Sequence, residues 1–227
     1  MKSIIYFILI VLISSCDFKS ADDYYRSAVI NFNNHNYREA IYSYGKAIIK
    51  NPKLLGAYLD RGLCFEALNK IDSAILDYKK VLIIDTNNIQ ALYNIGICKS
   101  KQNLYNEAHY YFTKALYNKG FSDSSVSLIM DMNKDFIWAD KMESFDVPSY
   151  EIFFDRGFAN YNLKKMKSAY LDFNRCIENN YNLGKSYHMV GLCWLSANNK
   201  PKACEALKLA VYNKDSSAVD LWYKTCK

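Results

Sequence analysis

The chain has 227 residues, of which 51% are hydrophobic and 23% charged, and this composition excludes an intrinsically disordered chain. Only 8 Gly and 3 Pro occur, which excludes collagen-like and Pro-rich folds and favours helices. The formal net charge of +6 is too small to demand a nucleic-acid partner by itself.

The first sixteen residues have the pattern of an export signal. A positively charged start precedes an apolar run over 4–13, which is shorter than the roughly 20 residues that span a membrane. The run ends in ISSC at Cys16, which resembles the lipobox of bacterial lipoproteins. The resemblance implies a signal peptide over 1–15, acylation of Cys16 and a short tether over 16–20. The alternatives are an ordinary signal peptide with a chance Cys, or an uncleaved anchor.

Small and aromatic residues then recur at an interval of 34 residues. Gly62 and Gly96 are separated by this interval, and so are Gly157 and Gly191. The same interval relates the alanines within two series: Ala40, Ala74 and Ala108, and Ala169 and Ala203. A large residue follows each alanine four positions later: Tyr44, Tyr78, Phe112, Phe173 and Leu207. A fixed period of this length predicts a helical repeat.

This pattern resembles the tetratricopeptide repeat (TPR) family, whose unit has a small residue at position 8, Ala at 20 and an aromatic residue at 24. The resemblance covers three units over 21–122 and two units over 150–217. It implies an all-α fold, an α-solenoid of helix-turn-helix units in which small side chains let paired helices approach closely. The helix pairs are expected to turn back near five positions: His35, Asn69, Asn103, Lys164 and Asn198.

Two segments depart from the complete units. Residues 123–149 interrupt the period, and we interpret them as a short degenerate repeat or as a linker between two runs of units. Residues 218–227 follow the last unit in phase and predict a C-terminal capping helix, because a terminal repeat needs its apolar face covered.

The cysteines beyond Cys16 fall into two groups. Four lie at positions that the family gives to small buried residues: Cys64, Cys98, Cys176 and Cys193. Cys204 lies early in a second helix and Cys226 late in the antiparallel capping helix, so a Cys204–Cys226 disulfide is predicted in an oxidising compartment. Cys193–Cys204 is the competing pair.

The sequence contains no pattern of zinc ligands, no Gly-rich phosphate loop and no nucleophile elbow, and its three His are isolated. We therefore expect no catalytic residue, no metal site, no cofactor and no enzymatic activity.

The TPR resemblance also implies a concave binding face made by the first helix of each unit. We name the apolar residues predicted there the groove residues: Tyr25, Val29, Phe32, Leu59, Leu63, Tyr93, Ile97, Phe154 and Phe158. An exposed surface of this kind usually marks an interface. The alternative is that curvature of the solenoid buries part of it. The basic residues with which some TPR receptors clamp a C-terminal carboxylate are not found at the matching positions.

These features predict a lipid-anchored adaptor or scaffold of the cell envelope that binds a segment of another envelope protein through the groove. Contact with the membrane is expected through Cys16, with the outer membrane favoured and the inner membrane possible. Nucleic acid is not an expected partner. The alternative is a structural subunit of an envelope complex, docked through the convex face or through 123–149.

Overall fold

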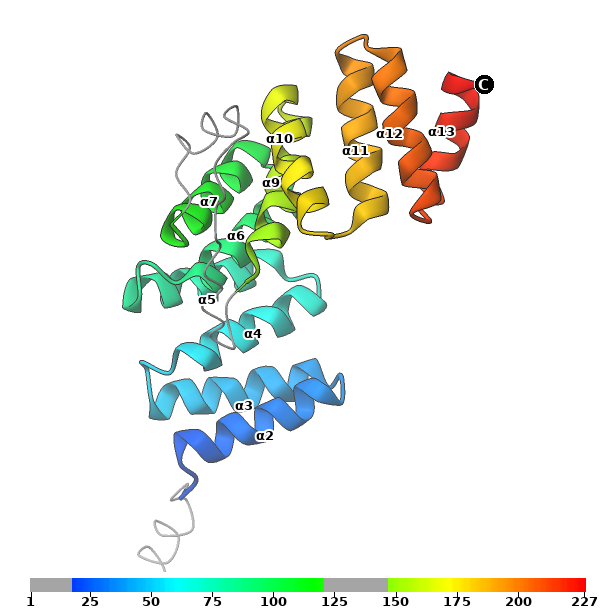
Figure 1. Ribbon diagram of the computed structural model, residues 1–227. Helices are drawn as coiled ribbons and strands as arrows, with labels where there is room; N and C mark the ends of the chain where they lie inside the picture. Colours follow the sequence, from blue (N-terminus) through cyan, green and yellow to red (C-terminus); the bar gives the residue numbers. More distant parts are fainter. Residues whose placement is uncertain (1–17, 121–146) are drawn as a thin grey trace, which may run out of the picture. The chain divides into compact units, whose positions relative to one another are not determined.

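The structure is a computed structural model that describes residues 18–120 and 147–227 (Figure 1). Within these two ranges the chain forms helices and turns and no strand. The helices are α2 (Ala21–Asn33), α3 (Tyr37–Lys50), α4 (Leu55–Ala67), α5 (Ile71–Ile84), α6 (Ile89–Lys101), α7 (Tyr105–Asn118), α9 (Ser149–Asn162), α10 (Met166–Glu178), α11 (Leu183–Ser196), α12 (Lys200–Tyr212) and α13 (Ser217–Cys226). The expected all-α class is confirmed.

The chain divides into two compact parts, one up to Asp77 and one from Tyr78 onward. In the first part α2 packs against α3, and α3 packs against α4. In the second part α6 pairs with α7, α9 with α10, and α11 with α12, so that antiparallel pairs follow one another along the chain. No helix among the described residues is long and apolar enough to cross a membrane.

Each helix pair is joined by a three-residue connection whose middle residue adopts the left-handed conformation. The residues with this backbone are His35 (φ 60°), Asn69 (φ 57°), Asn103 (φ 59°), Lys164 (φ 62°) and Asn198 (φ 55°). Asn tolerates this conformation better than most residues because its short polar side chain can satisfy nearby backbone groups. The five predicted turning points are therefore confirmed.

Small residues allow the paired helices to approach closely. The alanines at position 20 of the five units are fully buried: Ala40, Ala74, Ala108, Ala169 and Ala203. A Cβ atom added at Gly96 on α6 would lie 2.5 Å from Cε1 of Phe112 on α7. A Cβ atom added at Gly191 would lie 2.8 Å from Cγ of Leu207 on the partner helix. The 34-residue pattern of small residues thus reflects the sterics of the helix pairs.

Helix α9 packs directly against α7 in the second part of the chain. One buried cluster joins Phe112 and Leu116 of α7 to Ile152 and Phe153 of α9. The third and fourth units are therefore neighbours in the stack. The predicted degenerate repeat or linker over 123–149 lies, apart from its last three residues, outside the described residues, as do Cys16 and the predicted signal peptide.

Helix α13 packs against α12 at the end of the chain. Its residues Leu221 and Trp222 contact the buried Leu207 and Ala210 of α12. The apolar face of the last helix pair is thereby covered, as a terminal repeat requires.

Candidate functional site

The groove residues of the first part lie on α2 and α4. Tyr25, Val29 and Phe32 are half-buried around a cluster that includes the fully buried Ala28 and Ala40. On α4, Leu63 is also half-buried, whereas Leu59 is only 9% exposed. Leu59 is thus a packing residue, which corrects its prediction as an exposed contact. The alternative that curvature buries part of the groove holds at this position.

The hydroxyl of Tyr25 is bound to a carboxylate on the next first helix. Tyr25 Oη donates a hydrogen bond of 2.7 Å to Oδ2 of Asp60 on α4. Burial raises the pKa of Asp60, and hydrogen bonds from Tyr25 and Tyr44 oppose this shift. Burial, followed by the hydrogen bond to Asp60, raises the pKa of Tyr25. Because the hydroxyl of Tyr25 is bound to Asp60, the part of Tyr25 that could contact a partner is its ring.

The second part of the chain repeats this arrangement with Tyr93 and Asp155. Tyr93 Oη on α6 donates a hydrogen bond of 2.6 Å to Oδ2 of Asp155 on α9. Burial raises the pKa of Asp155 to about 6, the hydrogen bond from Tyr93 opposes that rise, and the nearby Glu151 carboxylate adds to it. Burial likewise raises the pKa of Tyr93. A carboxylate that ionises with difficulty is thus enclosed beside the groove residues.

The two Tyr–Asp pairs have the same place in the repeat. Tyr25 and Asp60 are 35 positions apart, and Tyr93 and Asp155 are 62 apart, which is 35 plus the 27-residue interruption. In both pairs the tyrosine stands at position 5 and the aspartate at position 6 of the next unit. Groove geometry is therefore maintained across the interruption.

The other groove residues of the second part lie on α6 and α9. Ile97 is half-buried against the cluster that contains Phe112. The ring of Phe154 lies 5.6 Å from that of Phe173 and 6.0 Å from that of Tyr181. Phe158 is 39% exposed, with its ring 6.3 Å from that of Tyr105. Phe158 is therefore the groove residue most open to a partner.

Asn94, which follows Tyr93 on α6, has an unused donor. Its side chain is only 8% exposed, and its Nδ2 has no hydrogen-bond partner among the described residues. A buried amide donor without a partner carries a desolvation cost.

Two ion pairs, one part-buried and one buried, hold two of the helix pairs together, and the sequence pattern alone did not indicate them. Arg61 binds Asp77 through two hydrogen bonds of 2.8 and 2.7 Å. Arg156 binds Asp172 in the same way, at 3.0 and 2.7 Å, and Asp172 also accepts a hydrogen bond from Asn160. Burial raises the pKa of Asp172, and Arg156 opposes that rise. Each pair is separated by 16 positions, at 7 and 23 of its unit, and this repeated spacing was the available signal.

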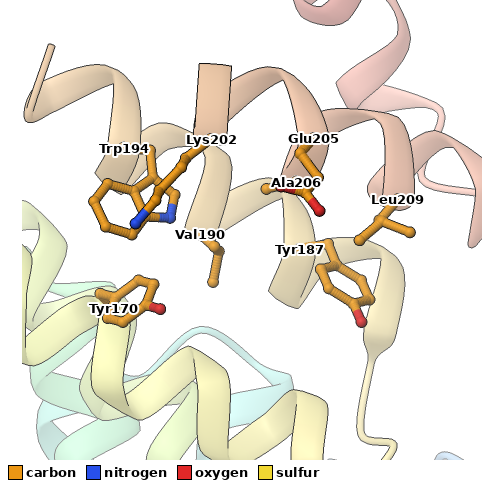
Figure 2. Close-up of a pocket in the computed structure, with 8 residues that line it drawn as sticks. All are labelled: Tyr170, Tyr187, Val190, Trp194, Lys202, Glu205, Ala206 and Leu209. Atoms are coloured by element: carbon orange, nitrogen blue, oxygen red, sulfur yellow. The ribbon is translucent and has the colours of Figure 1, made fainter. Parts of the chain in front are cut away.

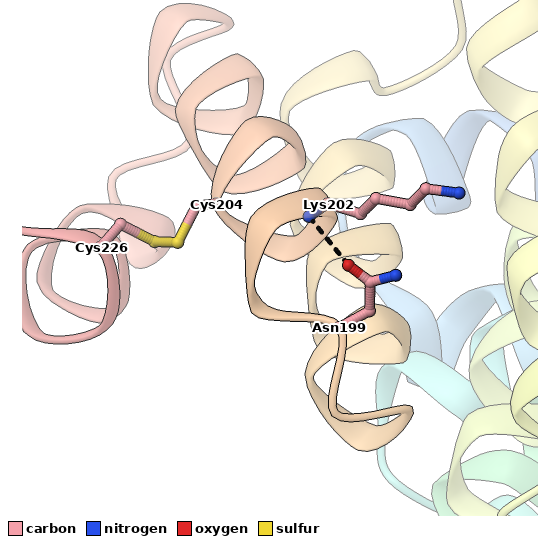
Figure 3. Close-up of a disulfide and its surroundings, with 4 residues drawn as sticks. All are labelled: Asn199, Lys202, Cys204 and Cys226. Atoms are coloured by element: carbon pink, nitrogen blue, oxygen red, sulfur yellow. Dashed lines mark hydrogen bonds between the residues drawn. A yellow bond between two sulfur atoms is a disulfide. The ribbon is translucent and has the colours of Figure 1, made fainter.

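The structure joins Cys204 of α12 to Cys226 of α13 in a disulfide, with 5.6 Å between the Cα atoms (Figure 3). This separation lies in the usual range for the bond. The competing pair does not form, because Cys193 is free and buried. Burial raises the pKa of the Cys193 thiol to about 12, and burial together with the Asp60 carboxylate raises that of Cys64 to about 12.

A depression of about 240 Å³ lies over α10, α11 and α12 and was not predicted (Figure 2). Its lining residues are Tyr170, Tyr187, Val190, Trp194, Lys202, Glu205, Ala206 and Leu209. Lys202 Nζ lies 4.5 Å from the centre of the Trp194 ring and covers it. The described residues contain no group of three or more His, Cys, Asp or Glu placed to hold a metal ion.

Similarity to solved structures identifies the fold. The structure of the MamA protein superposes with a TM-score of 0.67 at 15% identity, covering 87% of this chain and 93% of that one. The structure of PilW, described as a widely conserved type IV pilus biogenesis factor, gives a TM-score of 0.62 at 17% identity, covering 88% and 78%. Both contain tetratricopeptide repeats. The chain therefore has the TPR fold.

Sequence similarity to curated proteins covers only part of this chain. Sperm-associated antigen 1 of Rattus norvegicus is 34% identical over 64 residues, which are 28% of this chain and 7% of that protein. The chain thus spans only a small fraction of the relative's length. No protein-family model matches it.

Proposed function

We propose that this TPR protein is a non-enzymatic adaptor of the cell envelope, anchored by lipid at Cys16, that holds an extended segment of another envelope protein against its groove residues. The observation that carries the proposal is the half-open aromatic surface around Tyr93, Phe154 and Phe158. Repeat solenoids commonly bind extended partners on such surfaces. Rigid aromatic side chains are typical anchors of protein interfaces.

The polar groups beside the groove residues define the chemistry of the partner. Asp60 and Asp155 carry carboxylates beside the aromatic rings, so an acidic C-terminal tail would meet like charge. The partner segment is therefore apolar and neutral or basic.

Two observations support the envelope location. The apolar run followed by ISSC at Cys16 matches the pattern of a lipidated export signal. The similarly folded PilW is described as a pilus biogenesis factor, which is a role at the cell envelope. The outer membrane remains the favoured location and the inner membrane the alternative.

Replacement of the lipidation site tests the anchor. Cys16→Ser is expected to abolish incorporation of a fatty-acid label and to release the protein from the membrane fraction. Cys226→Ser is the matched control, because it removes a cysteine of the disulfide and leaves the anchor intact. Retention of the label by the Cys16→Ser protein would refute the anchor.

Photo-crosslinking in intact cells tests the groove. A photoreactive phenylalanine at Phe158 is expected to give one discrete adduct, whereas the same residue at Tyr212, which is 83% exposed on α12, is not. Tyr93→Ala should abolish the Phe158 adduct without changing the helical content. Tyr93→Phe, which removes only the hydroxyl, should retain most of it. Equal adducts from both positions, or an adduct unaffected by Tyr93→Ala, would exclude binding at the groove.

A further inference from the structure

The depression over α10, α11 and α12 lies at two repeat positions that other units fill. In the second and fourth units, positions 7 and 23 hold an Arg–Asp ion pair, as in Arg156 and Asp172. In the fifth unit the same positions hold Val190 and Ala206, and both line the depression of about 240 Å³ (Figure 2). Two short apolar side chains stand where a long ion pair stands elsewhere, which accounts for the hollow.

The third unit differs from the fifth at the same place. Its position 23 is Tyr111 on α7, whose side chain is half-buried. Its positions 11 and 19 are joined by an ion pair, with 2.8 Å between Nζ of Lys99 and Oε2 of Glu107. In the fifth unit positions 11 and 19 hold Trp194 and Lys202, and no ring stands at position 23. The hollow is therefore a feature of this unit and not of the repeat.

Three aromatic side chains line the depression. Tyr170 of α10 and Tyr187 and Trp194 of α11 are half-buried. The ring centres of Tyr170 and Trp194 lie 5.1 Å apart in an edge-to-face arrangement. Tyr187 lies on the other side of Val190 (Figure 2). Aromatic ring faces carry partial negative charge and attract the weakly positive hydrogens of C–H groups, so this lining favours a ligand with a C–H face.

The polar atoms of these side chains are available to a ligand. No hydrogen bond within residues 18–120 and 147–227 involves Oη of Tyr170, Oη of Tyr187 or Nε1 of Trp194. The exposed Glu205 forms no ion pair with another described residue. Hydroxyl, indole and carboxylate groups thus surround an aromatic lining, which suits a ligand that carries hydroxyl groups.

The charges at the depression favour a neutral ligand. Lys202 and Glu205 are the charged residues of the lining, and their charges cancel. Because Lys202 Nζ lies 4.5 Å from the centre of the Trp194 ring, an incoming cation would meet like charge there. The carboxylate of Glu205 disfavours an anion for the same reason.

We propose that this depression binds one ring of a neutral saccharide. A sugar ring has C–H faces for the aromatic side chains and hydroxyl groups at its edge for the tyrosine hydroxyls, the indole N–H and Glu205. An apolar side chain of a protein partner would instead cover these polar groups without giving them hydrogen bonds. None of the groove residues lines the depression, so the inference does not depend on the proposed adaptor function.

The test uses the full chain with ¹⁵N-labelled tryptophan, in a detergent without a sugar headgroup. Glucose, N-acetylglucosamine and chitotriose are added while the indole N–H signals are followed by NMR. At least one sugar should shift the Trp194 signal with a Kd on the order of 1 mM, as expected for so small a ligand. The signal of Trp222 on α13 should not change. Glucosamine and glucuronic acid, which are charged, should bind at least about threefold more weakly than the neutral sugars. Tighter binding of chitotriose than of N-acetylglucosamine would assign the site to a glycan chain, and equal binding to a free sugar.

Two variants locate the binding. Ala206→Tyr gives the fifth unit the ring that the third unit has, and it should abolish the shift while the helical content is retained. Tyr187→Phe should weaken binding at least about threefold through the lost hydroxyl, whereas Tyr223→Phe, at a residue that is 52% exposed on α13, is the matched control and should not. Absence of a shift with every neutral sugar, tighter binding of the charged sugars, or binding that both variants leave unchanged would each overturn the inference. A shift caused by N-acetylphenylalanine amide and by no sugar would assign the depression to a protein side chain and would also overturn it.

Discussion

The contact between Gly96 and Phe112 is the most direct test of how these helix pairs are held together. A Cβ atom at Gly96 would lie 2.5 Å from Cε1 and 2.7 Å from Cδ1 of Phe112, whose ring is fully buried. The ring would have to move by roughly 1 Å to restore an ordinary carbon–carbon separation of about 3.5–4.0 Å. Overpacking of this kind typically costs about 1–3 kcal/mol.

Helix propensity acts in the opposite direction. Ala in the middle of a helix is favoured over Gly by roughly 0.5–1 kcal/mol. We therefore expect Gly96→Ala to lower the free energy of unfolding by about 1–2 kcal/mol. At about 2–4 °C per kcal/mol for a chain of this size, the midpoint of thermal unfolding should fall by roughly 2–8 °C. Urea and thermal denaturation followed by circular dichroism measure both quantities.

Gly45→Ala is the matched control for this prediction. Gly45 also lies inside a helix, and the nearest atom to its added Cβ would be Nη1 of Arg61 at 3.5 Å, an ordinary contact. This variant should be more stable than the wild type by roughly 0.5–1 kcal/mol. Phe112→Leu in the Gly96→Ala background should recover part of the loss. A Gly96→Ala protein as stable as the Gly45→Ala protein would refute the steric account of position 8.

Two further predictions concern Asp155 and the disulfide. Burial raises the folded-state pKa of Asp155 to about 6, above its unfolded value of 3.8. The stability that the protonated Asp155 side chain contributes is therefore fully present below pH 3.8 and is lost as the pH rises through about 6. Between pH 4 and 7, the free energy of unfolding of the wild type, measured by urea denaturation, should fall by at most about 3 kcal/mol relative to that of Asp155→Asn. A difference between the two proteins that does not change with pH would contradict the pKa shift. Reduction of Cys204–Cys226, which closes a 22-residue separation, should cost about 3 kcal/mol and free α13, measured by denaturation with and without reductant. An unchanged midpoint would show that the bond contributes nothing to stability.

The helix pairs could be predicted because their constraints are local. A small residue at position 8 and a left-handed residue such as Asn69 or Asn103 leave a direct trace in the sequence. Cys204 and Cys226 could be paired because adjacent antiparallel helices bring their ends together. These inferences needed only one helix pair and its neighbour.

The burial and contacts of the groove residues could not be predicted to the same degree. The burial of Leu59 depends on the packing of neighbouring helices, which is not encoded in any single position. The contact between Tyr93 and Asp155 requires knowing that the third and fourth units are neighbours despite the 27 residues inserted between their repeats. The pairing of Arg156 with Asp172 was not predicted, because a charged residue in a helix is usually solvated, whereas this pair is buried between two helices.

The raised pKa values of the buried thiols have a consequence for the maturation of the chain. At a pKa of about 12, the thiolate fraction of Cys64 or Cys193 at pH 7 is on the order of 10⁻⁵. Only the thiolate attacks another sulfur, so once the helices are packed these cysteines are nearly inert to oxidants. If the helices pack before oxidation, the buried cysteines react too slowly to compete, and Cys204 pairs with Cys226. A chain that met an oxidase before packing would expose every thiol at once and would depend on disulfide isomerisation to recover.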